Sequence, residues 1–205
     1  MYRGPKEKKE RSLGERLNLK GERCASPKCA AVRKPYKPGM HGPKARRKTP
    51  SEFGLQLKEK QKFKVSYGVG ERGLRNVFRR ASKAKGSSAL KIVEFLERRL
   101  DNAIFRLGFA PSRGAARQLI VQGHIMVNGG RVRSPGFLVK KGDVIGVRAE
   151  SGSKQLFVKR MEVLKKFEPP AWLHLDAAKL EGRVLSPPEE SIPFEANLVV
   201  ESFSK

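Results

Sequence analysis

The chain has 205 residues, of which 45 are Lys or Arg and 20 are Asp or Glu, so its formal net charge at pH 7 is +25. Hydrophobic residues make up 38% of the chain, and no stretch approaches the roughly 18 consecutive apolar residues of a membrane helix. The composition therefore excludes a membrane span and favours a polyanionic partner, for which nucleic acid is the common case.

The positive charge is distributed unevenly along the chain. Residues 1–48 carry a net +12 and residues 49–154 a net +14, whereas residues 155–205 carry a net −1. The last quarter is therefore not expected to lie on phosphate. The N-terminal letters "MYRGPKEKKER" lack the apolar core of a signal peptide, which favours a bacterial cytoplasm.

The first 48 residues show little periodicity and are rich in Pro and Gly, as in "KPYKPGMHGPKARRKTP". Such a segment cannot bury enough apolar surface to fold alone. We predict that residues 1–48 form an extended basic segment that orders only against a partner.

Two helices are predicted next. Thr49 is the expected N-cap of the first, which runs to about Tyr67 with Phe53 and Leu57 on its inward face. The second is predicted over residues 71–84, with its apolar residues inward and its arginines outward.

A strong 3.6-residue apolar stripe follows in "ALKIVEFLERRLDNAIFRLG", which predicts one continuous helix ending at Gly108. Ser112 is placed to cap a shorter helix over residues 113–122, and Gly123 is placed to end it. Both helices belong to a compact unit that continues into a hairpin.

The hairpin is predicted from "HIMVNGGRV", because Asn128-Gly129 suits a two-residue type I′ turn. That register pairs Val127 with Gly130. "FLVKKGDVIGV" predicts two further short strands around a Lys-Gly-Asp turn. A helix is expected over about 155–167, followed by short strands around "WLHLD" and "NLVVESF".

Arginines recur through the predicted unit at helical spacing. Arg113 and Arg117 are i, i+4 neighbours near a helix N-terminus, where backbone N–H groups and guanidinium forks suit phosphate. Arg99 and Arg106 also share a face, and Asp101 is placed to orient a neighbouring arginine. For any single arginine a solvated surface is an equal alternative, but the set as a whole favours nucleic acid.

The letters "LERRLDNAIFRLGFAPSRGAARQLIVQGHIMVNGGRV" with "VKKGDVI" closely resemble the RNA-binding module of small-subunit ribosomal protein four, of bacterial type. "LKGERCASPKCAAVRKPYKPGMHG", "KEKQKFKVSYGVGERGLRNVF", "WLHLD" and "NLVVESFS" resemble other segments of that family in the same order. The resemblance covers nearly the whole chain, apart from roughly its first 14 residues.

The resemblance implies an α+β fold with an extended basic N-terminal segment, a helical lobe completed by C-terminal residues, and an inserted helix–helix–β-hairpin RNA-binding module. The segment is expected over 1–48, the lobe over 49–90 with about 155–205, and the module over 91–150. Residues 151–205 are expected to supply a helix and short strands that pack on the lobe.

The resemblance also implies a structural constituent of the small ribosomal subunit rather than an enzyme. Such proteins bind the 5′ domain of small-subunit rRNA early in assembly, and contact ribosomal protein five at an interface linked to translational accuracy. With ribosomal proteins three and five they line the place where messenger RNA enters the subunit. Some members in bacteria also repress translation of their own message.

Carried over by motif match, the RNA-binding residues fall into two sets. The set in the module is Arg99, Arg106, Ser112, Arg113, Arg117, Gln118, His124 and Asn128. The set in the other lobe is Lys44, Arg46, Arg47, Lys48, Lys58, Lys60, Lys62 and Arg75. His124 follows a helix-ending glycine, so a turn histidine held by hydrogen bonds is an equal alternative.

The only two cysteines, Cys24 and Cys29, lie in "CASPKC", a spacing at the upper limit of half a zinc knuckle. A structural zinc needs four ligands, and family members that carry zinc have a second cysteine pair upstream that this chain lacks. His41 is a conceivable third ligand, but "PGMHG" fits a turn against RNA better. We expect no cofactor and two reduced thiols.

Three rival functions fit the sequence less well. An RNA-modifying enzyme would need a catalytic domain, and neither a Cys–His pair nor a phosphate loop is evident in the sequence. A free-standing RNA chaperone usually has little beyond the module, whereas this chain has long flanks. DNA binding through charge alone would be nonspecific.

Overall fold

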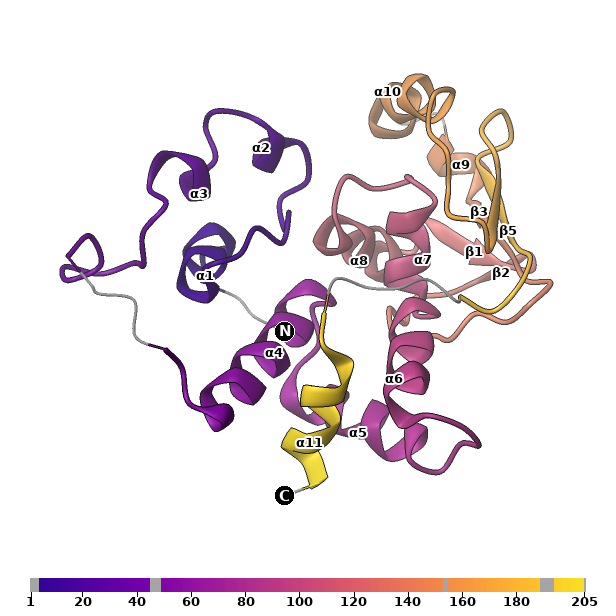
Figure 1. Cartoon of the computed structure of the whole chain (residues 1–205). Coiled ribbons are helices and arrows are strands. Elements are labelled where there is room, and N and C mark those ends of the chain that lie inside the picture. The colour runs from indigo at the N-terminus through magenta and orange to yellow at the C-terminus, as the bar shows by residue number, and fades with distance from the viewer. Residues whose placement is uncertain (1–3, 45–48, 153–154, 189–193, 205) are drawn as a thin grey trace. The chain divides into compact units, whose positions relative to one another are not determined.

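A computed structural model describes residues 4–44, 49–152, 155–188 and 194–204. The chain divides into two compact units, the first made of Met1–Val93 with Ile192–Lys205 and the second of Glu94–Ser191. The helices are α1 (Lys6–Leu13), α2 (Glu22–Ala25), α3 (Ala30–Arg33), α4 (Glu52–Ser66), α5 (Glu71–Ala81), α6 (Ser88–Glu97), α7 (Leu100–Arg106), α8 (Arg113–Gln122), α9 (Ala149–Gly152), α10 (Gln155–Leu164) and α11 (Ala196–Ser204) (Figure 1). The strands are β1 (Ile125–Val127), β2 (Gly130–Arg131), β3 (Val144–Val147), β4 (Leu173–Asp176) and β5 (Glu181–Val184).

The N-terminal segment is folded, so the prediction that it is extended is wrong for residues 6–33. Helices α1, α2 and α3 surround a small cluster in which Leu13, Cys24 and Cys29 are buried. Buried carboxylates of α1 accept backbone N–H groups from the loops that follow it. The N-terminal segment has few apolar residues to bury, and hydrogen bonds to these carboxylates hold its helices and loops together instead.

Helix α4 begins slightly later than expected. Ser51 rather than Thr49 is its N-cap, and the Ser51 hydroxyl accepts the N–H of Gly54 at 3.3 Å. The helix ends at Ser66, close to the predicted end at Tyr67.

The inward face of α4 also differs from the prediction. Phe53 is 70% exposed and Leu57 is 43% exposed, whereas Gln56 and Phe63 are buried. The Phe63 ring lies 5.2 Å from that of Phe194 in the C-terminal segment. The buried face of α4 is therefore the face that contacts residues distant in the sequence. The spacing of apolar residues within the helix could not predict which face this is.

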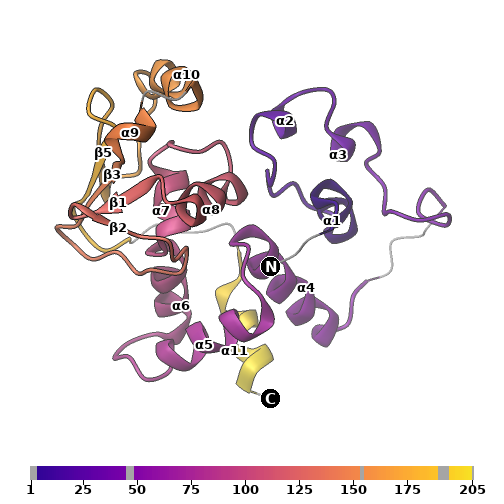
Figure 2. The ribbon, with the colours of Figure 1, turned by 180° about the vertical axis from the view of Figure 1, so that it is seen from behind.

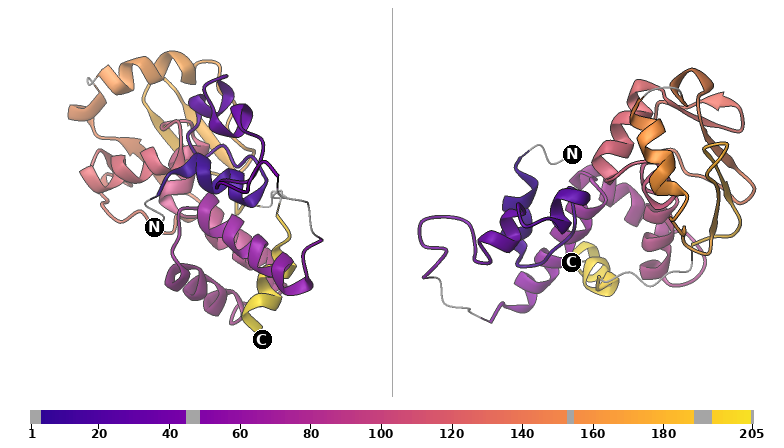
Figure 3. Two further views of the ribbon diagram at one scale, coloured as in Figure 1. Left: turned by 90° about the vertical axis from the view of Figure 1, so that its left-hand side faces the viewer. Right: turned by 90° about the horizontal axis from the view of Figure 1, so that it is seen from above.

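The letters "NLVVESF" form helix α11, not the predicted strand. Val199 is fully buried and Phe203, four residues later, stacks on Phe78 of α5 at 5.1 Å between ring centroids. Figure 3 shows α11 beside α4, where the Gln56 amide donates to Glu201 at 3.0 Å. The i, i+4 apolar pair of Val199 and Phe203 gives α11 the one-sided face of a packed helix.

The predicted continuous helix is broken into α6 and α7. Arg99 between them is extended (φ −66°, ψ 138°), and its neighbours bond instead to the loop before β3. The Val139 N–H donates to the Arg98 carbonyl at 2.9 Å, and the Leu100 N–H donates to the Phe137 carbonyl at 2.8 Å. These bonds replace the helical ones that the break removes.

The predictions for α8 are confirmed at both ends. The Ser112 hydroxyl accepts the N–H of Ala115 at 3.2 Å, and Gly123 ends the helix in the left-handed region at φ 77°. Helix α8 contacts α7, so that the two helices lie side by side (Figure 2).

The hairpin is confirmed in turn and register. Asn128 and Gly129 have φ values of 49° and 77°, as a type I′ turn requires, and Val127 pairs with Gly130. "FLVKKGDVIGV", by contrast, contributes one strand, β3. Ahead of it Leu138 forms only an isolated bridge with Arg99.

The sheet has five strands in the order β2-β1-β3-β5-β4, with antiparallel pairing throughout. Because β5 pairs with β3, the segment from α10 to β5 belongs to the module's unit. The expected packing of 151–205 on the helical lobe is therefore wrong up to β5, and among the described elements of that range α11 alone packs there. One apolar core joins α7, α8, α10 and the sheet through residues such as Ile104, Ile120 and Ile145.

The mixture of helices with an antiparallel sheet is an α+β fold, as predicted. No helix among the described residues is long and apolar enough to cross a membrane.

Candidate nucleic-acid interface

Helix α8 presents Arg113 and Arg117 toward α7. The Arg113 Nε donates to the Asn102 side-chain oxygen at 2.7 Å, and its guanidinium lies over the Phe105 ring, 4.7 Å from the centroid. Arg117 lies 3.7 Å from a carboxylate oxygen of Asp101, and its side chain is 34% exposed. Both guanidinium groups are therefore held by residues of α7 while part of each remains open to solvent.

Arg99 and Arg106 are held in the same way by carboxylates. Arg99 makes a two-pronged bond to Asp101 at 3.0 and 2.7 Å, which confirms that Asp101 orients neighbouring arginines. Arg106 donates to both oxygens of Glu97 at 3.0 and 3.2 Å, and the Glu97 side chain is fully buried. A guanidinium has five N–H donors, so a paired arginine keeps others for a phosphate.

We refer to Arg99, Arg106, Arg113 and Arg117 as the arginine row. Buried Glu97, Asp101 and Asn102 connect its members, because Asn102 bonds to both Glu97 and Arg113. This buried set contains only two carboxylates for the four guanidinium groups of the row, so the site carries a local excess of positive charge. Fixing long side chains in advance lowers the entropy that is lost when they bind a rigid anionic partner.

The other predicted module residues lie around the row in different roles. Ser112 caps α8, and Gln118 is exposed on that helix. The His124 Nδ1 lies 2.9 Å from the Ser151 hydroxyl and its ring meets Phe157 edge-on, as expected of a packed turn histidine. The exposed Asn128 donates to Asp143 at 2.9 Å.

Sequence reasoning missed four exposed cations beside the hairpin. These are Arg131, Arg133, Lys140 and Lys141. Arg131 donates to the carbonyls of Gly123 and Gln122 at the end of α8. The other three form no ion pair with a described residue. Their signal was present as "RVR", which begins in the second strand of the hairpin, and as "KKG" before β3.

In the first unit the predicted lysines of α4 are engaged in ion pairs. Lys62 is 6% exposed between Glu59 and Glu15, which leaves it little surface to offer RNA. Lys58 also pairs with Glu15, at 3.2 Å. Burial alone would raise the pKa of Glu15, but the hydrogen bonds from Lys62 and Lys58 outweigh it and hold that pKa below its ordinary value. Lys60 lies 4.0 Å above the Phe203 ring.

The arginines of α5 form the open cationic surface of this unit. Its four arginines are all exposed, as predicted, and make no ion pair with any described residue; they are Arg72, Arg75, Arg79 and Arg80. Lys44 is exposed as well, whereas Arg46, Arg47 and Lys48 lie outside the described residues.

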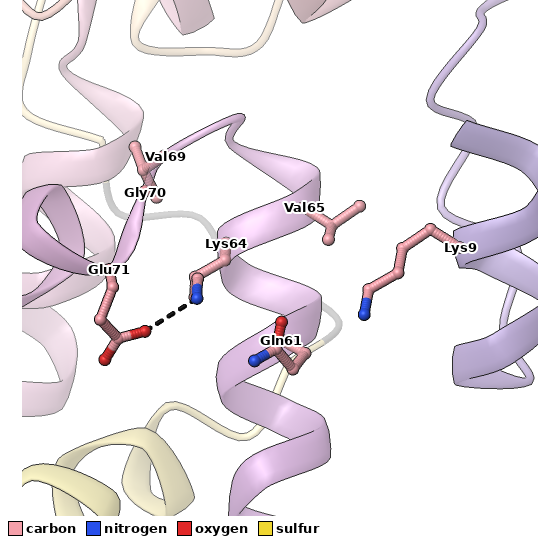
Figure 4. Close-up of a pocket in the computed structure, with 7 residues that line it drawn as sticks. All are labelled: Lys9, Gln61, Lys64, Val65, Val69, Gly70 and Glu71. Atoms are coloured by element: carbon pink, nitrogen blue, oxygen red, sulfur yellow. Dashed lines mark hydrogen bonds and ion pairs between the residues drawn. The ribbon is translucent and has the colours of Figure 1, made fainter. Parts of the chain in front are cut away.

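A hollow of about 230 Å³ is lined by residues of α1, α4 and the start of α5. Figure 4 shows these residues. Lys64 donates to Glu71 there at 2.8 Å, and this bond, with the one from Lys60, holds the pKa of Glu71 below its ordinary value. Lys9 points toward the same space. The lining residues offer ammonium groups and one ionised carboxylate that is already paired with lysines.

The cysteines do not complete a metal centre. Within the described ranges, no three His, Cys, Asp or Glu residues are grouped so that they could hold a metal ion. Cys24 and Cys29 are both buried free thiols, and burial raises the pKa of the Cys24 thiol. A structural zinc site needs four ligands, so these two thiols are too few to form one.

Comparison with known proteins gives matches along the whole chain. Residues 1–97 match the ribosomal protein S4/S9 N-terminal domain, and residues 98–145 match the S4 domain. Small ribosomal subunit protein uS4 of Thermus thermophilus is 44% identical over 207 residues, covering 100% of this chain and 99% of the relative. The protein of that name from Caldicellulosiruptor bescii is 48% identical with the same coverage.

Proposed function

The chain belongs to the family of small ribosomal subunit protein uS4, and from this membership we propose that it is a structural component of the small ribosomal subunit that binds rRNA. The family is one of ribosomal structural proteins and not of enzymes. The structural observation that supports the proposal is the arginine row, whose four arginines lie in the S4 domain match and whose guanidinium groups are fixed by neighbouring side chains.

The chemistry of the row suits folded RNA. RNA of this kind is recognised through its shape, its phosphates and its 2′-hydroxyls rather than through duplex base edges. Guanidinium groups in fixed positions can match phosphates that converge where several RNA helices meet. The exposed arginines of α5 supply a second set of contacts, so that binding involves both units.

The finer role we propose is binding of the 5′ domain of small-subunit rRNA, early enough to nucleate assembly of the subunit body. We extend the proposal to contact with ribosomal protein five, with consequences for accuracy, and to a place with ribosomal protein three where messenger RNA enters. Repression of its own message is a further part of it. Support comes from the co-linear family segments and from the near-neutral residues 155–205, which suit protein contact.

Sedimentation of cell lysate tests the ribosomal role. The tagged full chain is expected to comigrate with small subunits in a one-to-one ratio with their other proteins, and to stay bound through a high-salt wash. A chain found mainly in the light fractions, or removed from subunits by salt that leaves other proteins bound, would contradict the role.

A further inference from the structure

The N-terminal cluster contains four buried side chains that have the spacing of zinc ligands without forming a zinc site. Cys24 and Cys29 are 3% and 1% exposed. Glu7 and Glu10, one helical turn apart on α1, are 7% and 1% exposed. The two glutamates thus have the Cys-x-x-Cys spacing that the sequence lacks upstream of its cysteine pair.

Glu10 organises the loop between α1 and α2. One of its carboxylate oxygens accepts two backbone N–H groups, from Leu17 at 3.2 Å and from Leu19 at 2.9 Å. Next to Leu19, the Lys20 N–H donates to the Cys24 sulfur at 3.3 Å. Glu10 therefore fixes the backbone next to Lys20, the residue that bonds to the first cysteine.

Glu7 organises the segment around the second cysteine. Its Oε1 meets Arg23 at 2.8 Å and Lys20 at 3.1 Å, and its Oε2 accepts the N–H of Ala30 at 3.1 Å. Ala30 directly follows Cys29. The hydrogen bond from Arg23, with those from Lys20 and Ala30, lowers the pKa of Glu7 to about 2, so the carboxylate remains charged at neutral pH.

A structural zinc ion ties distant segments together through four ligands. Here α1 is tied to the two cysteine-bearing segments by carboxylate bonds instead. We propose that Glu7 and Glu10 replace a structural metal, so that the N-terminal cluster of this chain folds without any metal ion. Cys24 and Cys29 then serve as buried apolar thiols rather than as ligands. This inference concerns folding and does not rest on the RNA-binding role.

The sharpest test restores the ligands. The full chain carrying Glu7→Cys and Glu10→Cys is expected to bind one zinc ion per molecule, measured by elemental analysis after dialysis, with cobalt giving the absorption of a four-thiolate tetrahedral site. The matched control carries Lys6→Cys and Lys9→Cys, which have the same spacing on another face of α1, and is expected to bind none. The proposal fails if the wild-type chain itself retains stoichiometric zinc. It also fails if the variant with Glu7→Cys and Glu10→Cys binds no more metal than the control.

A second test addresses the carboxylates directly. With Glu7→Gln and Glu10→Gln, hydrogen exchange at the amides of Leu17, Leu19 and Ala30 is expected to quicken by roughly tenfold or more, because bonds to a charged acceptor are removed. A chelator is expected to leave exchange in the wild-type chain unchanged. Faster wild-type exchange with chelator, or unchanged exchange in the variant, would overturn the proposal. Glu22→Gln, at an exposed site beside the cluster, is the control.

Discussion

Replacing Arg113 and Arg117 by Ala is expected to weaken binding to a 5′-domain fragment of small-subunit rRNA by about 10²- to 10⁴-fold. Each substitution would remove charge-assisted hydrogen bonds of about 1.5–3 kcal/mol, and every 1.4 kcal/mol is about a tenfold change in affinity. Their partners Asn102 and Asp101 would also be left with open bonding groups. Filter binding or fluorescence titration at fixed salt measures the change.

The salt dependence separates a specific phosphate interaction from general charge. For each phosphate that the variant no longer neutralises, the slope of log affinity against log salt is expected to become shallower by roughly 0.7 to 0.9. The control is Lys165→Ala with Lys166→Ala, which removes the same charge from exposed positions after α10. Equal losses of affinity in the two double variants would show that only net charge matters. Unfolding curves recorded in parallel establish that both variants are folded.

The second large effect is on stability. Glu97→Gln is expected to lower the free energy of unfolding by about 3–5 kcal/mol, because it breaks a buried ion pair and leaves the Arg106 guanidinium without this charged partner. The Glu97 side chain is fully buried and also accepts the Asn102 amide at 2.8 Å. Urea unfolding of the RNA-free chain measures the difference.

Glu94→Gln is the matched control, one helical turn earlier on α6. Glu94 pairs with Arg98 at 2.9 Å, and both side chains are partly exposed. A pair of that kind contributes about 1 kcal/mol or less. If the two variants unfolded at the same urea concentration, Glu97 would not hold the arginine row as described.

The sequence predicted best those parts of the second unit whose structure is determined locally. Ser112 and Gly123 are strong cap residues, and Asn128-Gly129 specifies its turn by positive φ values, so α8 and the hairpin follow from short stretches alone. The arginines were identified by spacing, and Asp101 was recognised as the group that orients them.

Apart from the N-cap of α4, which is a local error, most of the incorrect predictions concern residues whose partners lie in other segments of the chain. The buried face of α4 carries Gln56 and Lys62, whose partners Glu201 and Glu15 lie in other segments. The break between α6 and α7 depends on a loop nearly 40 residues later. The N-terminal cluster is held together by the carboxylates of Glu7 and Glu10. From composition alone, such charged residues are expected to be exposed to solvent.

The central claim is that this chain recognises a folded rRNA shape, and competition binding tests it most directly. The wild-type chain is titrated onto the 5′-domain fragment at physiological salt with an excess of unrelated structured RNA. The account predicts nanomolar binding that survives the competitor. Binding that the competitor removes would contradict it and would leave a polycation that binds RNA through charge alone.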